Sequence, residues 1–333
     1  MPNVSIHIHF LKVILESAVR HDINVINSLQ RNNISLQLLQ QTDTRVSARQ
    51  FSSFLADAIR AFEDELVGFS PYPLPLGSWS ALTHWVANTS TLGHAIKRFC
   101  RFYSLLEKGF KTILVIKGTQ ASVEIHPWND GTNYTSSSYE LFTFCLYRLL
   151  CLLTHDMLPL TQVNLPFAKP KHHREYHYFF YGNKIDFDYS TCSISFPREL
   201  LLKPIKQETG LINLLLNDSL YNIIVLNYDR TSWTSKVRDL ITANFEWKLG
   251  LSDVAFELGI KEHTLRRCLS KEGITYSVLR NQAKRDLAIF LLSNSQHSIE
   301  EIAFRTGFSE ASAFIRAFKS WTGVTPSTYR RSS

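Results

Sequence analysis

The sequence predicts two domains of different class: an α+β domain over residues 1–228, followed by an all-α domain over residues 229–333 with two helix-turn-helix motifs joined by a long helix. Three observations support this prediction. A chain of 333 residues exceeds the size that one hydrophobic core usually organises. Its first two thirds mix helical periodicity with alternating strand patterns. Its last third carries one helical unit written twice, which indicates a supersecondary unit used twice.

Helical patterns come first in the chain. Residues 10–40 carry apolar residues at helical spacing until Asn and Gln clusters interrupt them. Ser47, with Gln50 three residues later, forms a capping-box pattern that opens a stronger helix. The segment 68–77 contains three prolines and two glycines and is therefore a loop. A further amphipathic helix is predicted from Thr91 onwards.

Strand patterns dominate the following segment. Two apolar runs flank a Gly118-Thr119 turn, as expected of a β-hairpin. Three more short strands are interleaved with helices. The predicted ranges are 112–117 and 121–126 for the hairpin, 162–165, 184–187 and 193–196 for the other strands, and 138–153, 170–180 and 197–201 for the helical segments. A mixture of helices with antiparallel strands is typical of an α+β domain.

Two copies of a helix-turn-helix pattern lie 48 residues apart, over residues 251–272 and 299–321. Each copy pairs a short apolar helix with a second helix in which basic and apolar residues alternate. A glycine stands between the helices, Gly259 in the first copy and Gly307 in the second, and can adopt the positive φ of a tight turn. A helix pair with a basic second helix is typical of the DNA-reading motif, in which the second helix enters the major groove.

Capping residues mark the remaining helices of the second domain. Thr275 caps a connecting helix that runs to residue 292 and is roughly 25 Å long. Successive major-groove faces lie about 34 Å apart, so a helix of this length would place both second helices on one side of a duplex. Ser298 with Glu301 forms a capping box, and Ser309 is the expected N-cap of the last reading helix. The other predicted features are a hinge at 217–234 and a first helix at 233–245.

The net charge of +7 is concentrated in the second domain. Residues 229–333 hold 16 Lys and Arg against 11 Asp and Glu, a net charge of +5. Residues 1–228 hold 20 against 18, a net charge of +2. A basic excess around the repeat is expected of a surface that faces DNA phosphates, although many basic proteins bind no nucleic acid.

The cysteines and the apolar segments indicate a cytoplasmic protein. The five cysteines show no CxxC and no paired spacing, which argues for a reducing compartment and against structural zinc. The first residues lack the pattern of a signal peptide. The longest apolar stretch, 141–153, contains Arg148 and is too short to span a bilayer.

At the repeat, the sequence closely resembles the AraC/XylS family of bacterial transcription regulators. The second copy carries the family signature in Gly307-Phe308, Arg316-Ala-Phe-Lys319 and Gly323-Val-Thr-Pro326, and the first copy departs from it at Lys261 and Cys268. The resemblance implies sequence-specific binding to double-stranded promoter DNA, contact with RNA polymerase and no enzymatic activity. The rival interpretation is an enzyme or an effector-binding protein whose DNA domain is vestigial.

Most of residues 10–210 are similar to the effector-binding domain of the ornithine-utilisation branch of this family, which is often described as arabinose-binding-like. The motifs Thr91-Leu-Gly-His-Ala-Ile96 and Val163-Asn-Leu-Pro-Phe167 carry this looser resemblance. It implies an unidentified small-molecule effector, homodimerisation and an effector-responsive activator, with no cofactor and no membrane partner.

The second helix of each copy supplies the candidate DNA contacts. They are Lys261, His263, Thr264, Arg266, Arg267 and Lys271 in the first copy, and Ser309, Ala311, Ser312, Arg316 and Lys319 in the second. Arg is the commonest reader of guanine, and the family resemblance makes His263 and Arg267 the expected base readers. Ala311 is expected at a thymine methyl group, and Lys271 and Lys319 at phosphates. The plainer alternative for each residue is a helix cap or a solvated side chain.

Other chemistry has little support in the sequence. His173 and His177 are spaced to share a metal ion, but no third ligand is evident nearby, so no metal site is predicted. No nucleophile elbow and no Walker loop occurs. Some aromatic residues of the first domain are candidates for an effector pocket, and membership of the hydrophobic core is the commoner fate of such residues. These candidates are Trp79, Trp85, Phe99, Tyr103 and Tyr139.

Overall fold

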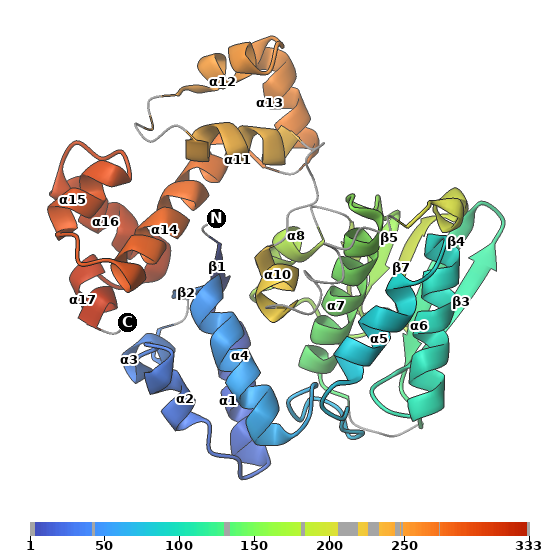
Figure 1. The fold of residues 1–333 in the computed structure, drawn as a ribbon. Coiled ribbons are helices and arrows are strands. Elements are labelled where there is room, and N and C mark those ends of the chain that lie inside the picture. The colour runs from blue at the N-terminus through green and yellow to red at the C-terminus, as the bar shows by residue number, and fades with distance from the viewer. Residues whose placement is uncertain are drawn as a thin grey trace. The chain divides into compact units, whose positions relative to one another are not determined.

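Two compact units make up the chain in the computed structural model (Figure 1). Unit 1 comprises residues 1–12, 26–54 and 229–333, and unit 2 comprises residues 13–25 and 55–228. Helices α1 (Ile8–Arg20) and α4 (Ala48–Phe62) contribute residues to both units. The structure describes residues 4–41, 44–129, 134–180, 184–205, 219–225, 233–243, 247, 249–272 and 274–331.

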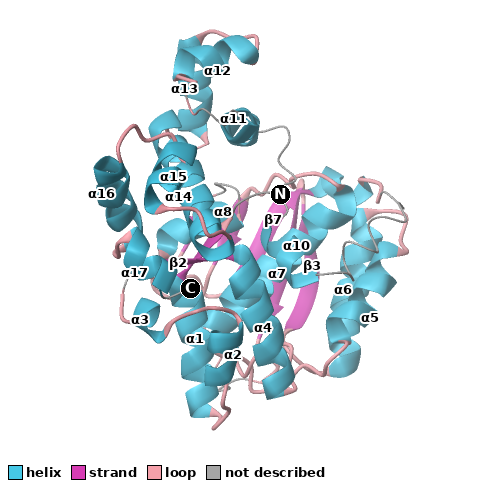
Figure 2. Cartoon of the chain, turned by 60° about the vertical axis from the view of Figure 1, so that its left-hand side comes forward, coloured by secondary structure: helices cyan, strands magenta, loops and turns pink. Residues whose placement is uncertain are grey.

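A five-stranded sheet organises unit 2 (Figure 2). Its strand order is β3-β4-β7-β5-β6, and all neighbouring pairs are antiparallel except β5 and β6. The hairpin between β3 and β4 turns at Gly118, which has a φ of +57°. The strands are β3 (Lys111–Lys117), β4 (Gln120–His126), β5 (Gln162–Asn164), β6 (Ile185–Asp186) and β7 (Cys192–Pro197).

Helices α6 (Leu92–Leu106) and α7 (Ser136–Thr154) pack against this sheet. Side-chain caps start both helices, because Thr91 accepts from the His94 N–H and Thr135 accepts from the Ser138 N–H. The remaining helices of the unit are α5 (Ser78–Ala87), η1 (His173–Glu175), α8 (Tyr176–Phe179), η2 (Arg198–Leu202) and α10 (Ser219–Val225).

Unit 1 combines an N-terminal segment with the helices of the repeat. Its strands β1 (Ser5–His7) and β2 (Arg45–Ser47) pair antiparallel. A long helix, α14, packs against helices on both sides of it in the sequence, including α11, α15 and α16. The helices are α2 (Ile26–Arg31), α3 (Leu36–Leu39), α11 (Trp233–Ala243), α12 (Leu251–Glu257), α13 (Glu262–Lys271), α14 (Tyr276–Asn294), α15 (Ile299–Arg305), α16 (Ala311–Thr322) and α17 (Pro326–Arg331).

The predicted fold class is confirmed: a sheet-containing N-terminal region is followed by a helical region with two helix-turn-helix motifs joined by a long helix. Several details differ. The helical segment 10–40 is three helices, and Asp22 and Asn33 adopt positive φ between them. The segment 170–180 contains only η1 and the single turn of α8. Strands β1 and β2 are absent from the prediction because three-residue strands carry no readable period. Helix α5 is also absent from the prediction.

Parts of two predictions lie outside the described residues. They are residues 217–218 and 226–232 of the predicted hinge, and residues 244–245 at the end of the predicted first helix. The described part of the hinge contains α10. Among the described residues, no helix is both long enough and apolar enough to cross a membrane.

Candidate nucleic-acid interface

Helices α12 and α13 form the first motif around a small apolar cluster. Val254 and Ala255 of α12 are buried together with Leu265 and Leu269 of α13. Gly259 takes a φ of +67° in the turn between the helices, as the sequence predicts. Because the two leucines hold one side of α13 against the cluster, the opposite side of α13 faces solvent.

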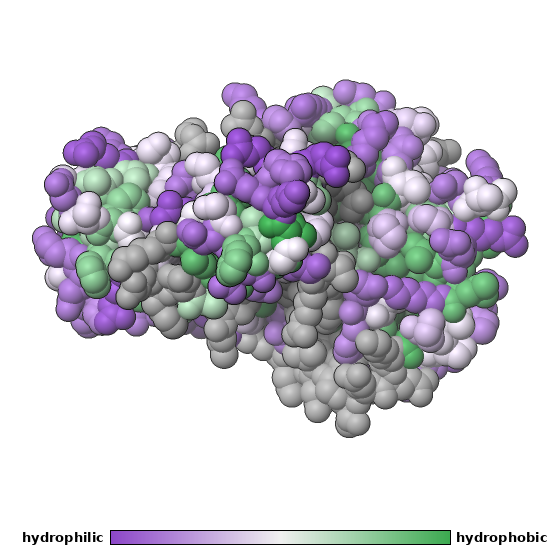
Figure 3. All heavy atoms as spheres, turned by 90° about the horizontal axis from the view of Figure 1, so that it is seen from above, coloured by the Kyte–Doolittle hydropathy of each residue, from purple (hydrophilic) through white to green (hydrophobic). Residues whose placement is uncertain are grey.

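The exposed side of α13 carries the predicted contacts of the first copy. His263, Arg266 and Arg267 are exposed and lie three and four residues apart, so they share one face. The Nη2 atom of Arg266 lies 2.5 Å from Oε1 of Glu262, whereas Arg267 has no polar partner among the described residues. Lys261, at the N-cap, is also exposed. Figure 3 looks down from the side of α12 and α13 in Figure 1, and it shows purple hydrophilic residues beside a green hydrophobic patch near the middle of the view.

The other two predicted contacts of this copy, Thr264 and Lys271, are not among the exposed side chains that the structure describes on this face. Thr264 is half-buried on α13, and its backbone N–H donates to the carbonyl of Lys261 at 2.9 Å. The side chain of Lys271 lies outside the described residues. Its expected contact with phosphate therefore stays a prediction.

Helices α15 and α16 form the second motif in the same way. Ile302 and Ala303 of α15 are buried, as are Phe314 and Phe318 of α16. The predicted capping box is confirmed: the Ser298 side chain accepts from the Glu301 N–H at 3.1 Å, and the Glu301 carboxylate accepts from the Ser298 N–H at 2.7 Å. Gly307 takes a φ of +73° in the turn.

The solvent side of α16 carries the predicted contacts of the second copy. Ser312, Arg316 and Lys319 are exposed at i, i+4 and i+7, on one face of the helix, and Ala311 is half-buried. Arg316 has no polar partner among the described residues. The solvent-facing arginine is therefore a feature that both second helices share.

The predicted N-cap of α16 is wrong by one residue. Ser309 is exposed, but Glu310 is the N-cap, with an extended backbone (φ −139°, ψ 139°) and no side-chain capping bond. A cap at Ser309 would need helical backbone angles at Glu310, which the structure does not have. The Glu310 carboxylate instead accepts from the Ser312 hydroxyl at 3.1 Å.

Helix α14 connects the two motifs within unit 1. The predicted N-cap is confirmed, because the Thr275 side chain accepts from the Val278 N–H. The helix has 19 residues and ends at Asn294, two residues beyond the predicted end. Its length is therefore about 28 Å at 1.5 Å per residue. Leu279 and Ala283 of α14 join the apolar cluster of the first motif, so this helix is part of that core as well as a connector.

The aromatic candidates for an effector pocket in unit 2 belong largely to its core. Phe99 and Tyr103 are buried against Phe142, with ring centroids 5.9 and 4.9 Å away. Trp79 and Tyr139 are half-buried against the same core. Burial raises the pKa of Tyr139 to about 12. These residues therefore support the fold of unit 2, as the plainer interpretation expects.

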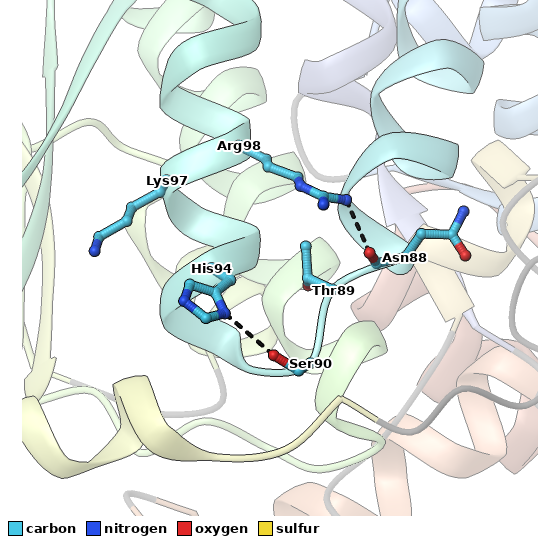
Figure 4. Close-up of a pocket in the computed structure, with 6 residues that line it drawn as sticks. All are labelled: Asn88, Thr89, Ser90, His94, Lys97 and Arg98. Atoms are coloured by element: carbon cyan, nitrogen blue, oxygen red, sulfur yellow. Dashed lines mark hydrogen bonds between the residues drawn. The ribbon is translucent and has the colours of Figure 1, made fainter.

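A polar pocket of about 520 Å³ lies at the start of α6 (Figure 4). Two of its basic groups are engaged internally: Arg98 donates to the carbonyls of Trp85 (2.7 Å) and Asn88 (2.8 Å), and the His94 ring lies 3.1 Å from the Ser90 hydroxyl. These bonds hold the turn between α5 and α6. The pocket is lined by Asn88, Thr89, Ser90, His94, Lys97 and Arg98.

The histidines near residue 173 are also used in the fold. Nδ1 of His173 lies 3.0 Å from the carbonyl oxygen of Pro170. His172 contacts the buried carboxylate of Glu140 at 3.0 Å, and the Tyr176 hydroxyl donates to the same carboxylate. Burial raises the pKa of Tyr176. The side chain of His177 lies outside the described residues.

Two family models match the chain. The arabinose-binding domain of AraC transcription regulators, N-terminal part, matches residues 23–205, which is more than half of the chain. A helix-turn-helix domain matches residues 254–332. Neither is an enzyme family, in agreement with the expectation that the chain is not an enzyme.

Similar proteins are transcription regulators by name. The ornithine utilization regulator of Pseudomonas aeruginosa is 27% identical over 260 residues, which are 77% of this chain and 76% of that protein. The urease operon transcriptional activator of Escherichia coli is 31% identical over 142 residues, 38% of this chain and 48% of that protein. A crystal structure of the regulator CdpR from Pseudomonas aeruginosa is 20% identical and covers 83% of this chain and 87% of its own, with a TM-score of 0.31. The chain belongs to the AraC family of transcription regulators, as its second helix-turn-helix copy predicts.

Proposed function

We propose that this regulator binds a discrete promoter site through α13 and α16 together. Each of these helices has a buried apolar side and an exposed side with an arginine, Arg267 or Arg316, that has no polar partner among the described residues. This shared feature carries the proposal, because the guanidinium fork matches O6 and N7 of guanine. His263 is the second base reader on α13. The other exposed residues differ between the two helices, so the site that they read is asymmetric.

The remaining polar residues on these faces would position the protein on the DNA backbone. Phosphate contacts are sequence-independent and fix register, and Lys, Ser and Thr side chains commonly make them. Ala311, half-buried at the start of α16, has the size and apolarity to meet a thymine methyl group. The proposed backbone contacts are Lys261, Thr264, Arg266 and Lys271 of the first copy, and Ser309, Ser312 and Lys319 of the second.

A footprint tests this function directly. Purified full-length protein is expected to protect a discrete segment upstream of genes that neighbour its own gene. The protected segment should span two successive major-groove faces. A random duplex at the same salt concentration is the control, because non-specific binding depends mainly on phosphate charge. Equal binding to both duplexes, with no protected segment, would favour the rival interpretation of a vestigial DNA domain.

The N-terminal region is the proposed sensor of a small-molecule effector, and its occupancy would lead to activation. The arabinose-binding match at residues 23–205 supports sensing, and the names of several relatives, which are transcriptional activators, support activation. We place the boundary between the sensing and DNA-binding domains at 228/229, where one division between the compact units falls. A thermal-shift screen of metabolites on the full chain would identify the effector. In-vitro transcription with and without that compound would give the sign of regulation.

RNA polymerase is the proposed protein partner, and homodimers and a cytoplasmic location fit such a regulator. One pair of exposed residues supports a protein contact. Phe256 on α12 and Phe304 on α15 occupy matching positions of the repeat and are 83% and 80% exposed. Neither lies on a reading helix. Phe256→Ser with Phe304→Ser is expected to leave the footprint intact and to reduce transcription. Unchanged transcription would remove this support.

A further inference from the structure

Trp247 lies outside both predicted motifs, in the segment between α11 and α12. It is 4% exposed and belongs to the apolar cluster of the first motif, with Val254, Leu265 and Leu279. Its φ of +54° is uncommon for a large side chain, so the surrounding contacts must hold it there. By packing alone, Trp247 is a core residue of the first copy.

The polar edge of Trp247 reaches the second copy. Its indole N–H donates to the carbonyl oxygen of Arg305 at 2.8 Å. Arg305 is the last residue of α15, immediately before the turn that leads to α16. A side chain in the core of one motif is thus hydrogen-bonded to the turn of the other, 58 residues along the chain.

The turn of the second copy is shaped to accept this ring. A Cβ atom on Gly307 would lie 2.5 Å from Cβ of Trp247 and 2.8 Å from its Cγ, too close for any residue larger than glycine. At the matching position of the first copy, a Cβ atom on Gly259 would meet nothing within 4 Å. Both glycines need positive φ, but only Gly307 must also be small.

Lys284 of α14 also contacts both Trp247 and the turn at Gly307. Its amine donates to the carbonyl of Gly307 at 2.8 Å. The amine also lies 5.7 Å from the ring centroid of Trp247 and 4.5 Å from that of Phe308, within the range of cation–π attraction. Arg280, one turn earlier on α14, donates to the carbonyl of Trp247. We name Trp247, Lys284 and the Arg305–Gly307 turn the Trp247 clamp.

We infer that the Trp247 clamp fixes the separation and angle between the two reading helices, and that Trp247 is a positioning residue for DNA recognition which touches no DNA itself. The inference rests on the proposed function of α13 and α16. Without the clamp, α14 would be the main connection between the two motifs. One base pair corresponds to about 3.4 Å along the duplex and about a tenth of a turn, so a small change between the motifs misplaces one helix by a base pair.

Trp247→Phe tests the inference, because it keeps an aromatic ring in the cluster and removes the N–H that reaches Arg305. The probe is a duplex that the wild-type full-length protein selects from a random library. Two derivatives have one base pair inserted or removed between the protected major-groove segments. The control is Trp233→Phe, since Trp233 packs against the same cluster and its indole makes no hydrogen bond to the second motif among the described residues.

The wild type and Trp233→Phe are expected to bind the parent duplex with at least about tenfold higher affinity than either derivative. A loss of this size is typical of a site with a mismatched base pair. Trp247→Phe should lose about three- to tenfold on the parent, the effect of one net hydrogen bond, with little loss on the derivatives. Its preference for the parent spacing therefore falls, and Lys284→Gln should behave in the same way. Circular dichroism melting checks that each variant is folded. If Trp247→Phe does not fold, the result for Lys284→Gln decides the inference.

Two results would overturn the inference while leaving DNA recognition intact. One is an unchanged spacing preference in folded Trp247→Phe or Lys284→Gln. The other is an equal loss of affinity on all three duplexes, which would give Trp247 a purely structural role. If the wild type selects no duplex from the library, the proposed function fails as well, and the two failures are thereby distinguished.

Discussion

The two copies of the helix-turn-helix unit have the same turn and different surroundings. In each copy the glycine N–H donates to the carbonyl oxygen three residues before it, at 2.9 Å. Gly259 donates to Phe256, and Gly307 donates to Phe304. The glycine φ values, +67° and +73°, are nearly equal. The turn of the first copy is open, whereas that of the second is packed against Trp247 and Lys284. A repeated sequence pattern therefore reports shared local geometry, and does not report shared packing.

The second copy is also held by the N-terminal segment of unit 1. The Tyr329 hydroxyl, on α17, donates to the carbonyl of Arg45 at 2.9 Å, and the Thr44 hydroxyl donates to the carbonyl of Thr322 at 2.7 Å. Among the described residues, no hydrogen bond joins residues 1–54 to the first motif. The second copy is thus anchored on several sides, and the first depends on its own core and on the Trp247 clamp.

The largest effect that separates the copies is expected from Gly307→Ala. Alanine at this position would adopt an unfavourable positive φ, and its methyl group would also clash with the Trp247 side chain. The free energy of unfolding should therefore fall by about 3–4 kcal/mol. Gly259→Ala is the matched variant, and it meets only the backbone cost of about 1–2 kcal/mol. Urea unfolding of both proteins measures the difference. Equal losses would show that the second turn is as open as the first in solution.

Lys284 provides a pH test of the same packing. Burial, with the charge of Arg280, lowers the pKa of Lys284 to about 8 from an ordinary value of 10.5. Between these values the unfolded chain binds a proton that the folded chain has lost, so stability from this group rises with pH. The stability of wild type relative to Lys284→Met should therefore increase from pH 8 to pH 10, by up to about 1.4 kcal/mol per pH unit. Melting temperatures of both proteins at each pH measure this. A difference that stays flat would mean that the amine is solvated, and a difference that falls would mean that the fold favours the charged amine.

The next effect concerns the arginine that each copy is proposed to place on a DNA base. Arg267→Ala and Arg316→Ala are each expected to lose about 1–3 kcal/mol of binding free energy on the selected duplex, with relaxed specificity at one base position. Arg266→Ala, whose partner is Glu262, is the control in the first copy and should lose less. Competition binding against base-substituted duplexes measures all three. An equal loss on specific and random DNA would reassign the arginines to phosphates.

Features that depend on neighbouring residues could be predicted from the sequence. Ser298 with Glu301, Thr275 and Ser47 with Gln50 were recognised as caps because the partners stand three residues apart, and all three caps are present. Ser309 failed because two polar residues precede the apolar run, and spacing alone does not decide which of them is the last extended residue. Local chemistry thus located the helices well and their ends less well.

Features that depend on distant residues were missed. Nothing near Trp247 in the sequence indicates that its indole bonds to a carbonyl 58 residues later. The only signal in the sequence is indirect: a tryptophan flanked by the charged residues Glu246 and Lys248, just before a motif. The pairing of Ser5 with Ser47 in β1 and β2 was equally unreadable, because each strand has only three residues. The grouping of residues 1–12 and 26–54 with the helical repeat follows from such contacts.

The smallest expected effect concerns how each copy begins. In the second copy, Ser298→Ala should remove one half of the capping box and cost about 1 kcal/mol. In the first copy the box is one-sided: the Asp253 carboxylate accepts from the Gly250 N–H at 2.7 Å, and glycine has no side chain to accept in return.

Gly250→Ser would complete that box. Gly250 has a φ of −86°, which any residue can adopt, and a Cβ atom there would lie 3.3 Å from the flexible end of Asp253. Glycine is already a fair N-cap, so the expected gain is only a few tenths of a kcal/mol. Urea unfolding of Gly250→Ser, with the double variant Gly250→Ser and Asp253→Ala as control, measures it. If the gain persists without Asp253, the box is not its source, and the weaker start of the first copy must be attributed to the conformational freedom of glycine in the unfolded chain.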